Sequence, residues 1–264
     1  MSTTEPLATA PQRLPDDDGA FIAYHRTPGL RPGVVFLTGY MSDMTGQKAL
    51  RLEEHCRSHD RAFVRFDYFG HGASFGAFTD GTIGRWADDA IRVLDQLTDG
   101  PQVLVGSSLG GWIMLLAARA RPQRIAGLLG VAAAPDFTED LILPVLSPGE
   151  RRTLERDGVV PMFSPYDPQP TPVAQRLLVE AREHLVLRQP IALQCPVRLI
   201  HGMRDPDVPW KTALRLADCL VGDDIEITLV KAGDHRLSTP GDLDRLCDAL
   251  DLLLRRIEAS PHAR

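Results

Sequence analysis

The sequence predicts an α/β fold in which a mostly parallel central sheet is flanked by helices. Short runs rich in β-branched residues alternate along the chain with longer segments of helical periodicity, which is the pattern of repeated strand-helix units. The run from Val34 to Leu37 is apolar on every residue, as expected for a central strand that is buried on both faces. A chain of 264 residues with 44% hydrophobic content can bury one large core.

The strands and helices of this fold can be placed in order along the chain. Strands are expected at residues 34–38, 62–67, 103–106, 125–132, 197–201 and 225–230. Helices are expected at residues 45–58, 83–98 and 109–121, followed by a last helix whose apolar face runs from Leu243 to Ile257. Asp99-Gly100-Pro101 ends the second of these helices and Pro122 ends the third.

The segment between the strands that end at Ala132 and begin at Val197 differs in composition from the rest. Residues 136–189 are rich in proline and contain Ser147-Pro148 and Thr171-Pro172, two pairs at which helices are expected to begin. An insert of this length is too long for a plain connection. It predicts a helical lid, placed after the sixth strand of the fold, between two parts of one core at residues 1–135 and 190–264.

Composition and charge exclude several classes of protein. Lys+Arg at 29 against Asp+Glu at 35 gives a formal net charge of -6, and without a basic block a nucleic-acid partner is not expected. The apolar runs are too short to predict a membrane span. Residues 1–19 resemble neither a secretory signal nor a transit peptide, so a cytoplasmic location is expected. Only three basic residues are lysines, which favours a GC-rich bacterial source.

A candidate nucleophile follows the strand at residues 103–106. Gly106-Ser107-Ser108-Leu109-Gly110 matches the pattern G-x-S-x-G between an apolar strand and a helix. The glycines allow a tight turn that exposes the hydroxyl of Ser108, and the helix that follows directs its free amides towards an oxyanion. Ser108 stands centrally between the two glycines, so it is predicted to be the nucleophile in preference to Ser107.

The general base and the acid that a serine nucleophile needs are expected at the ends of later strands. His235 lies in the loop after the last strand and is the candidate for the base. Asp205 and Asp207 follow the strand at residues 197–201, at the carboxyl edge of the sheet where α/β sites lie. Asp136 follows an earlier strand and is a further candidate. The residues alone leave these three possibilities for the acid.

Together these motifs resemble the α/β-hydrolase-fold serine hydrolases, from about residue 21 to residue 257. The family carries H-G-x-x-D-x-x-V-P around its acid, and residues 201–209 match this motif. The match implies that Asp205 is the acid and that Asp207 is a rim residue. The family's D-x-x-G-x-G-x-S is present at residues 67–74 and implies a structural turn.

Residues 37–44, 105–112 and 201–210 resemble one subfamily more closely, the mitochondrial acyl-protein (palmitoyl) thioesterases and acyl-glucuronide esterases. The resemblance implies an acyl-enzyme mechanism on a small-molecule ester, an acyl thioester or an acylated protein, and we expect no metal or organic cofactor. It also implies an oxyanion hole made by the backbone amides of Leu109 and Tyr40, with Met41 as the alternative to Tyr40. The mitochondrial address is not expected, because the N-terminus does not resemble a transit peptide.

The lid and two residues of the core are expected to contact the substrate. Met41 and Trp112 stand within the motifs just described. The lid has more apolar residues than a solvated connection needs, and Leu141, Met162 and Phe163 are expected to face an acyl chain of medium or long length. In the alternative interpretation the apolar lid residues pack against the core and leave a small pocket for acetyl or butyryl esters.

Two other functions stay open on the sequence alone. A non-catalytic ligand-binding protein would keep the fold and the lid, although it has no need for Ser108, Asp205 and His235 together. Another reaction, such as the hydrolysis of carbon–carbon bonds or lyase chemistry, would use the same scaffold. Haloalkane dehalogenation is disfavoured, because its nucleophile is an aspartate where this chain has a serine.

His55 and His59 stand one helical turn apart in the first predicted helix. Two histidines at this spacing are found in metal sites, but no acidic third ligand accompanies them at a recognised spacing. We therefore expect a solvated helix face at these positions and no metal site.

Overall fold

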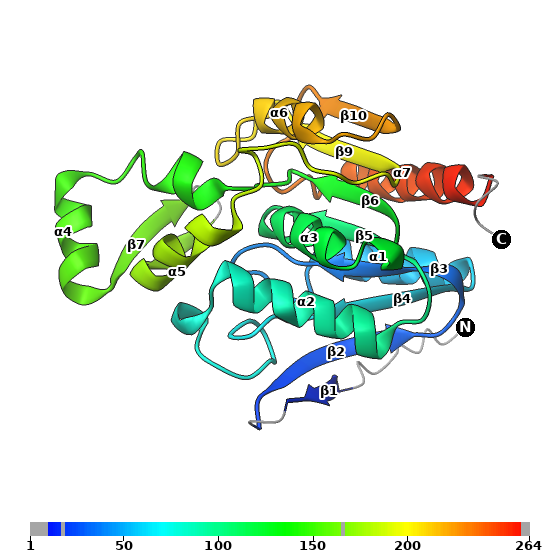
Figure 1. Cartoon of the computed structure of the whole chain (residues 1–264), viewed down its shortest axis with the longest axis horizontal. Coiled ribbons are helices and arrows are strands. Elements are labelled where there is room, and N and C mark those ends of the chain that lie inside the picture. Colours follow the sequence, from blue (N-terminus) through cyan, green and yellow to red (C-terminus); the bar gives the residue numbers. More distant parts are fainter. Residues whose placement is uncertain (1–9, 17–18, 165–166, 260–264) are drawn as a thin grey trace, which may run out of the picture.

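The structure is a computed structural model that describes residues 10–16, 19–164 and 167–259 of the chain. The described residues form an eight-stranded sheet in the order β1-β2-β4-β3-β5-β6-β9-β10, with helices on both faces (Figure 1). Strand β2 runs antiparallel to both of its neighbours, and the remaining pairs are parallel. The mostly parallel sheet confirms the predicted fold class.

All the strands expected from the sequence are present in the sheet. They are β3 (Leu30–Leu37), β4 (Arg61–Phe66), β5 (Gln102–Ser107), β6 (Ile125–Val131), β9 (Val197–Gly202) and β10 (Ile225–Val230). Two further strands were not predicted, β1 (Gln12–Pro15) and β2 (Phe21–Thr27). They lie at one edge of the sheet and mix exposed with buried residues, so they lack the continuous apolar run that identifies a central strand.

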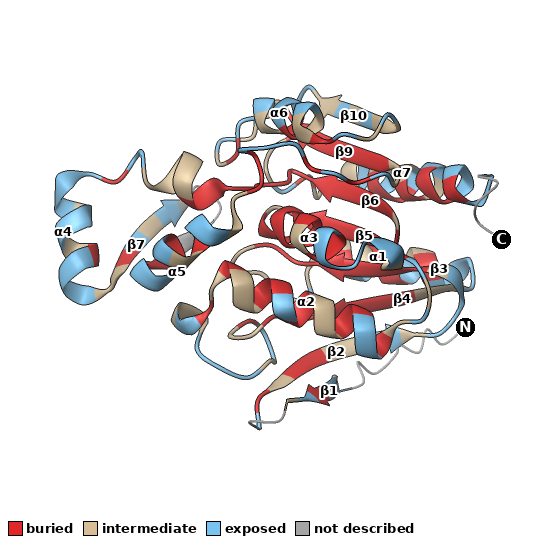
Figure 2. Cartoon of the chain, viewed as in Figure 1, coloured by how far each residue is buried: buried red, intermediate tan, exposed pale blue. Residues whose placement is uncertain are grey.

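Alternate residues of the central strands pack into two hydrophobic clusters, one on each face of the sheet. The helices that cover these faces are α1 (Gln47–Ser58), α2 (Ile83–Leu97), α3 (Leu109–Ala120), α6 (Lys211–Cys219) and α7 (Pro240–Glu258). On β3, Val34 and Phe36 belong to the cluster that includes α1 and α7, whereas Val35 and Leu37 belong to the cluster that includes α2 and α3. Figure 2 shows the central strands buried along most of their length.

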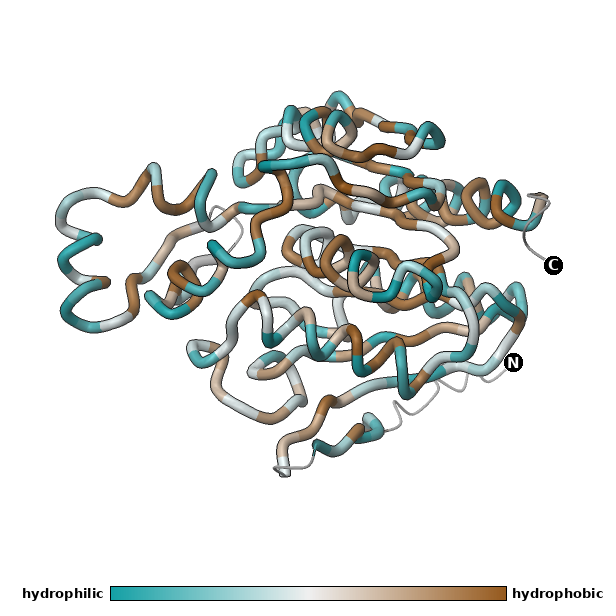
Figure 3. The backbone as a smooth tube through the Cα atoms, in the orientation of Figure 1, coloured by the Kyte–Doolittle hydropathy of each residue, from teal (hydrophilic) through white to brown (hydrophobic). Residues whose placement is uncertain are grey.

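The chain between β6 and β9 folds into a separate small layer beside the sheet, which we call the insert (residues 136–189). It contains a π-helical turn (Thr138–Ile142), α4 (Pro148–Asp157), β7 (Val159–Ser164), β8 (Asp167–Ala174), α5 (Gln175–Glu180) and a 3-10 turn (Ala181–His184). Buried apolar residues give it a small core of its own: Leu146, Leu154, Val160, Val173 and Leu178. The insert lies at the left of Figure 1, and α4 on its outer side is largely hydrophilic (Figure 3).

One of the two helix starts predicted in the insert is right and the other is wrong. Ser147 caps α4 in a reciprocal arrangement with Glu150, as the sequence indicated. Thr171 and Pro172, however, belong to strand β8, and the next helix begins only at Gln175. Valines at the ends of the two paired strands favour extended backbone, and proline is tolerated because a two-stranded sheet has only edge strands. The insert is therefore built from helices and a β-hairpin, and is not purely helical.

Candidate active site

Ser108 lies at the sharp turn between β5 and α3, in a backbone conformation that residues other than glycine rarely adopt. Its φ is 54°, and the turn is held by hydrogen bonds from the Ser108 amide to the Val131 carbonyl and from the Ala134 amide to the Ser108 carbonyl, each 3.0 Å long. A Cβ atom on Gly110 would collide with the carbonyl of Leu37. This close, strained turn is typical of the elbow that presents a nucleophile in hydrolases.

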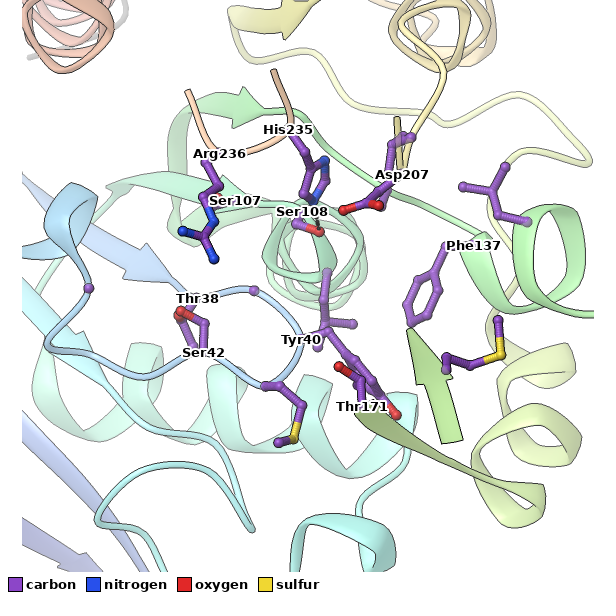
Figure 4. Close-up of a pocket in the computed structure, with 18 of the residues that line it drawn as sticks. Thr38, Tyr40, Ser42, Ser107, Ser108, Phe137, Thr171, Asp207, His235 and Arg236 are labelled. Carbon is purple, nitrogen blue, oxygen red and sulfur yellow. Dashed lines mark hydrogen bonds between the residues drawn. The ribbon is translucent and has the colours of Figure 1, made fainter. Parts of the chain in front are cut away.

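Asp205, His235 and Ser108 form a continuous series of hydrogen bonds at the carboxyl edge of the sheet. His235 Nε2 lies 3.0 Å from Ser108 Oγ, as drawn in Figure 4, and His235 Nδ1 lies 2.7 Å from Asp205 Oδ2. The loops that carry Asp205 and His235 follow the adjacent parallel strands β9 and β10. These loops approach closely because residue 202 is glycine, and a Cβ atom there would collide with the carbonyl of Gly233.

Several hydrogen bonds fix the carboxylate of Asp205 and keep it ionised. Its side chain is fully buried, and its Oδ1 accepts hydrogen bonds from the amides of Asp207 (2.9 Å) and Val208 (2.8 Å). His201 Nε2 lies 3.2 Å from its Oδ2. Burial alone would raise the pKa of Asp205, but hydrogen bonds from His201 and His235 lower it well below the ordinary value. An ionised carboxylate in this place can orient the imidazole of His235.

The two other acid candidates occupy different positions. Asp207 lines the cavity at Ser108 (Figure 4), and its backbone amide supports Asp205. Asp136 is fully buried and accepts hydrogen bonds from the amides of Val186 (2.8 Å) and Leu187 (2.9 Å). Because these amides stand near the end of the insert and Asp136 stands at its start, this carboxylate joins the two chain segments at the base of the insert.

The loop after β3 carries both candidates for the second oxyanion donor. Tyr40 and Met41 line the same cavity as Leu109, the first residue of α3. The loop is held in place by Asp67, whose carboxylate accepts a hydrogen bond of 2.7 Å from the amide of Met44. The structural role implied for the motif at residues 67–74 therefore has a physical basis, while the choice between Tyr40 and Met41 stays open.

The side chain of Tyr40 connects this loop to the insert, a role that sequence reasoning missed. Its hydroxyl donates a hydrogen bond of 2.8 Å to the carbonyl of Pro172 in β8, and burial raises the pKa of Tyr40 above its ordinary value. Its ring centroid lies 5.7 Å from that of Phe137 and 5.9 Å from that of Trp86. An oxyanion donor needs only a backbone amide, so no signal in the sequence points to a role for this side chain.

A cavity of about 860 Å³ opens beside Ser108 and extends under the insert. Four of the five residues expected to contact substrate line it, namely Met41, Leu141, Met162 and Phe163. Phe163 is 77% exposed, so this wall of the cavity is open to solvent. The volume lies in the usual range for small-molecule sites, about 300–1,000 Å³.

Trp112 is not among the residues that line this cavity, so the expectation that it contacts the substrate is wrong. It is fully buried, and its indole Nε1 donates a hydrogen bond of 3.0 Å to the carbonyl of His184. Trp112 lies one helical turn beyond Ser108 on α3, where the helix faces the hydrophobic core. Its ring contacts Phe137, with centroids 5.7 Å apart, and Phe137 in turn lines the cavity.

The opposite side of the cavity is polar and includes a lysine that sequence reasoning did not single out. Figure 4 shows Arg236, Thr38 and Ser42 on this side of Ser108, away from Tyr40 and Phe137.

Lys48 of α1 also lines the polar side and contacts the loop that carries His235. Its Nζ donates hydrogen bonds to the carbonyl of Arg236 (2.5 Å) and to Ser238 Oγ (3.4 Å). Burial lowers the pKa of Lys48 to about 8, although the nearby carboxylate of Asp234 opposes this shift. The one signal in the sequence is that Lys48 is among only three lysines in the chain.

The fold and the elbow together define a class of protein. Residues 34–259 match the alpha/beta hydrolase family, and the chain belongs to that family.

Curated proteins and a solved structure show which members of the family this chain is similar to. The Bos taurus protein named palmitoyl-protein thioesterase ABHD10, mitochondrial, is 42% identical over 244 residues, which are 91% of this chain and 79% of that protein. The Homo sapiens protein of the same name is 42% identical over 239 residues, 89% of this chain and 77% of that protein. The structure of alpha/beta hydrolase domain-containing protein 10 from mouse has a TM-score of 0.87 and 38% identity, and the match covers 94% of this chain and 100% of that one. These similarities confirm the subfamily resemblance.

The comparisons also correct the expected location and bear on the expected source. The curated relatives are named as mitochondrial proteins, which contradicts the cytoplasmic location expected from the N-terminus. They are animal proteins and give no support to the bacterial source expected from the low lysine content. A solved structure of a putative hydrolase from Agrobacterium vitis S4 is as similar, with a TM-score of 0.88 and 41% identity over 94% of this chain and 99% of that one, so the source stays a prediction. Within the described ranges, no helix is both long and apolar enough to cross a membrane.

Proposed function

We propose that this chain hydrolyses carboxylic esters or thioesters, with Ser108 as the nucleophile, His235 as the general base and Asp205 as the acid that orients it. The observation that carries the proposal is the pair of hydrogen bonds of 3.0 and 2.7 Å that joins these three side chains in triad order. The strained turn at Ser108 and the thioesterase relatives support the same assignment.

In the proposed reaction Ser108 Oγ attacks the acyl carbon while His235 Nε2 takes the hydroxyl proton. The imidazolium that forms is stabilised by the carboxylate of Asp205. The negative charge on the former carbonyl oxygen is stabilised by the amides of Leu109 and of Tyr40 or Met41.

Breakdown of the tetrahedral intermediate completes the acylation half of the reaction. The bond to the leaving oxygen or sulfur breaks, and His235 gives its proton to the departing alcohol or thiol. Water then attacks the acyl-enzyme with the same base, which releases the acid and restores Ser108. The chemistry needs only groups of this chain, the substrate and water.

We further propose that residues 136–189 act as a lid and that the acyl chain lies beneath it. Leu141, Met162 and Phe163 supply apolar surface on that side of the cavity, and the polar side near Arg236 would receive the leaving group. The relatives named as palmitoyl-protein thioesterases support a long acyl chain, carried by a small molecule or by a protein.

Labelling with a fluorophosphonate probe tests the nucleophile directly. Ser108 Oγ is expected to displace fluoride from phosphorus and form a stable adduct, which mass spectrometry of the digested protein locates on the peptide that contains Ser108. A protein that only binds ligands would give no adduct. An adduct on Ser107 would overturn the assignment of the nucleophile, and loss of ester turnover on treatment with EDTA would contradict a mechanism without a metal.

Turnover of p-nitrophenyl esters and acyl thioesters of graded chain length tests the acyl site. Each methylene that leaves water for the cavity contributes about 0.8 kcal/mol at most, which corresponds to a rise of roughly fourfold in kcat/KM per carbon. The rise is expected to continue until the cavity is filled. A flat or falling profile from two to ten carbons would favour the alternative in which the lid residues only pack against the core.

A further inference from the structure

Three side chains of the types that can bind a metal lie together where α1 meets α7, on the face of the sheet that carries these two helices. His55 is in the last turn of α1, His59 is the residue that caps this helix, and Asp251 is in α7. His55 Nε2 lies 2.8 Å from Asp251 Oδ1. One ligand atom from each of the three residues lies within 4.8 Å of the other two. The acidic third ligand, for which the local sequence offered no candidate, thus comes from a helix nearly two hundred residues away.

The distances suit a transition-metal ion with nitrogen and oxygen ligands. Zinc binds imidazole nitrogen and carboxylate oxygen at about 2.0–2.2 Å in tetrahedral geometry, so neighbouring ligand atoms lie about 3.3 Å apart. His55 Nε2 and Asp251 Oδ1 are already close to this separation, and the rings of His55 and His59 have centroids 4.4 Å apart. Small side-chain rotations would bring all three ligand atoms around one ion.

A hydrogen bond at the end of α1 holds the second imidazole in the form that a metal requires. His59 Nδ1 lies 2.8 Å from the carbonyl oxygen of His55, which can only accept, so Nδ1 carries the proton and donates. The lone pair of a neutral His59 is then on Nε2. Metal-ligating histidines usually have their second ring nitrogen held by a carbonyl or carboxylate in this way.

The surroundings of the cluster leave room and access for an ion. The three residues border a cavity of about 190 Å³, and His59 is exposed. Arg61 and Arg255 also border this cavity and oppose a cation, but Arg61 is paired with Glu258 at 2.8 Å. The carboxylate of Asp251 supplies negative charge within the cluster itself.

We propose that His55, His59 and Asp251 bind one divalent transition-metal ion, zinc by preference, with water as the fourth ligand. The bound ion joins the end of α1 to α7 and stabilises the packing of these helices on the sheet. Its role is structural, because among the described residues this cavity shares no lining residue with the cavity at Ser108. The site is therefore independent of the proposed hydrolase activity.

Equilibrium dialysis and thermal unfolding of chelator-treated full-length protein with added zinc test the site. We expect one zinc ion per chain and a rise in the unfolding midpoint of about 5 °C when free zinc is a hundred times its Kd. His59→Ala keeps the hydrogen bond between His55 and Asp251 but removes the chelate, so the variant is expected to unfold like the metal-free protein and to lose the response to zinc. Ester turnover should be the same in both proteins, with or without zinc.

A matched variant and a second metal separate this site from non-specific binding. His184 also pairs with a carboxylate one turn away, Glu180 at 2.9 Å, but that pair belongs to no group of three potential ligands in the described part of the chain. His184→Ala is therefore expected to keep the full response to zinc. Cobalt(II) bound in the same place should give the strong visible absorption of a tetrahedral complex, and His59→Ala should abolish it. Equal zinc binding by wild type and His59→Ala, or no binding by either, would overturn the proposal.

Discussion

The edge of the sheet that carries Ser108 and the insert above it are held together in different ways. At the sheet edge, a side chain holds each loop: Asp205 accepts hydrogen bonds from two amides of its own loop, the buried Asp67 holds the loop after β3, and the half-buried Lys48 holds the loop of His235. The insert has a small core of its own. Among the hydrogen bonds that join it to the body are those from Tyr40 to Pro172 and from the Gly84 amide to Glu180.

This difference agrees with the two roles proposed above, proton transfer at the sheet edge and acyl binding under the insert. Groups that transfer protons need fixed positions, because small misplacements reduce the rate strongly. A surface that accepts acyl chains needs area and some freedom to adapt. We therefore expect substitutions at the sheet edge to reduce turnover of all substrates alike, and substitutions at the contacts of the insert to change the preference among substrates.

Ser108→Ala is expected to have the largest effect. Removal of a serine nucleophile costs about 10⁶-fold in kcat when the rest of the triad remains, and the variant should also lose labelling by the fluorophosphonate. Ser107→Ala is the matched control, since Ser107 lies beside Ser108 at the end of β5, and this variant should keep most activity. Comparable losses in the two variants would show that the fold of the elbow, and not the hydroxyl, had been damaged.

Asp205→Asn should come second, with a loss of about 10⁴-fold in kcat. An amide cannot stabilise the imidazolium of His235 as a carboxylate does, and it disturbs the tautomer that accepts the proton of Ser108. Asp207→Asn changes a neighbouring carboxylate and is expected to cost no more than about threefold, because the backbone amide that Asp207 gives to Asp205 is kept. Steady-state kinetics of both variants measures the two losses in kcat. A larger loss in Asp207→Asn than in Asp205→Asn would assign the acid to Asp207.

The sequence predicted those parts of the fold and site whose cause is local. Ser108 is identified by five consecutive residues between a strand and a helix, and the central strands by runs of buried apolar residues. His235 is predicted from chain order, and Asp205 is predicted only through the family motif at residues 201–209, because the residues alone leave Asp207 and Asp136 open as well. Each of these motifs consists of residues that are neighbours in the sequence, although the hydrogen bonds of His235 reach residues 30 and 127 positions away.

The parts that the sequence did not predict depend on contacts between distant segments. Thr171-Pro172 satisfies the rule for a helix start, but pairing with β7 keeps it extended. Trp112 was expected to reach the substrate, yet the packing of α3 in the core turns it inward. Asp251 completes the cluster of His55 and His59 only because α7 returns to lie beside α1. Periodicity within one segment carries no information about these partners.

Lys48→Met tests whether the hydrogen bonds of Lys48 position the loop of His235 at the sheet edge, and it is expected to lower kcat by about tenfold. Methionine keeps the length and apolar character of the side chain but donates no hydrogen bond to the loop of His235. Lys211→Met replaces an exposed lysine at the start of α6 and should leave kcat unchanged. A rise in KM with an unchanged kcat would show that Lys48 contacts the substrate and does not position His235.

The pH dependence of stability tests the same lysine independently of activity. Because burial lowers the pKa of Lys48 to about 8 from its ordinary 10.5, the unfolded state binds more protons than the folded state between these values. The free energy of unfolding should therefore rise with pH across this window in the wild type, and this contribution should be missing in Lys48→Met. Denaturant unfolding of both proteins at pH 7 and pH 9.5 measures this contribution. An equal pH dependence in the two proteins would contradict the lowered pKa of Lys48.

Tyr40→Phe should have the smallest effect on turnover, and it tests the contact between the loop after β3 and the insert. The substitution keeps the aromatic contacts and the backbone amide of residue 40 but removes the hydrogen bond to Pro172, which contributes about 1 kcal/mol. If the lid holds the acyl chain, kcat/KM should fall by up to about fivefold for an octanoyl ester and stay nearly constant for an acetyl ester. Tyr24→Phe, in strand β2, is the control and should change neither value. An equal loss for both esters would mean that Tyr40 acts through the oxyanion site, so that the loop and the insert cannot be treated as separate regions.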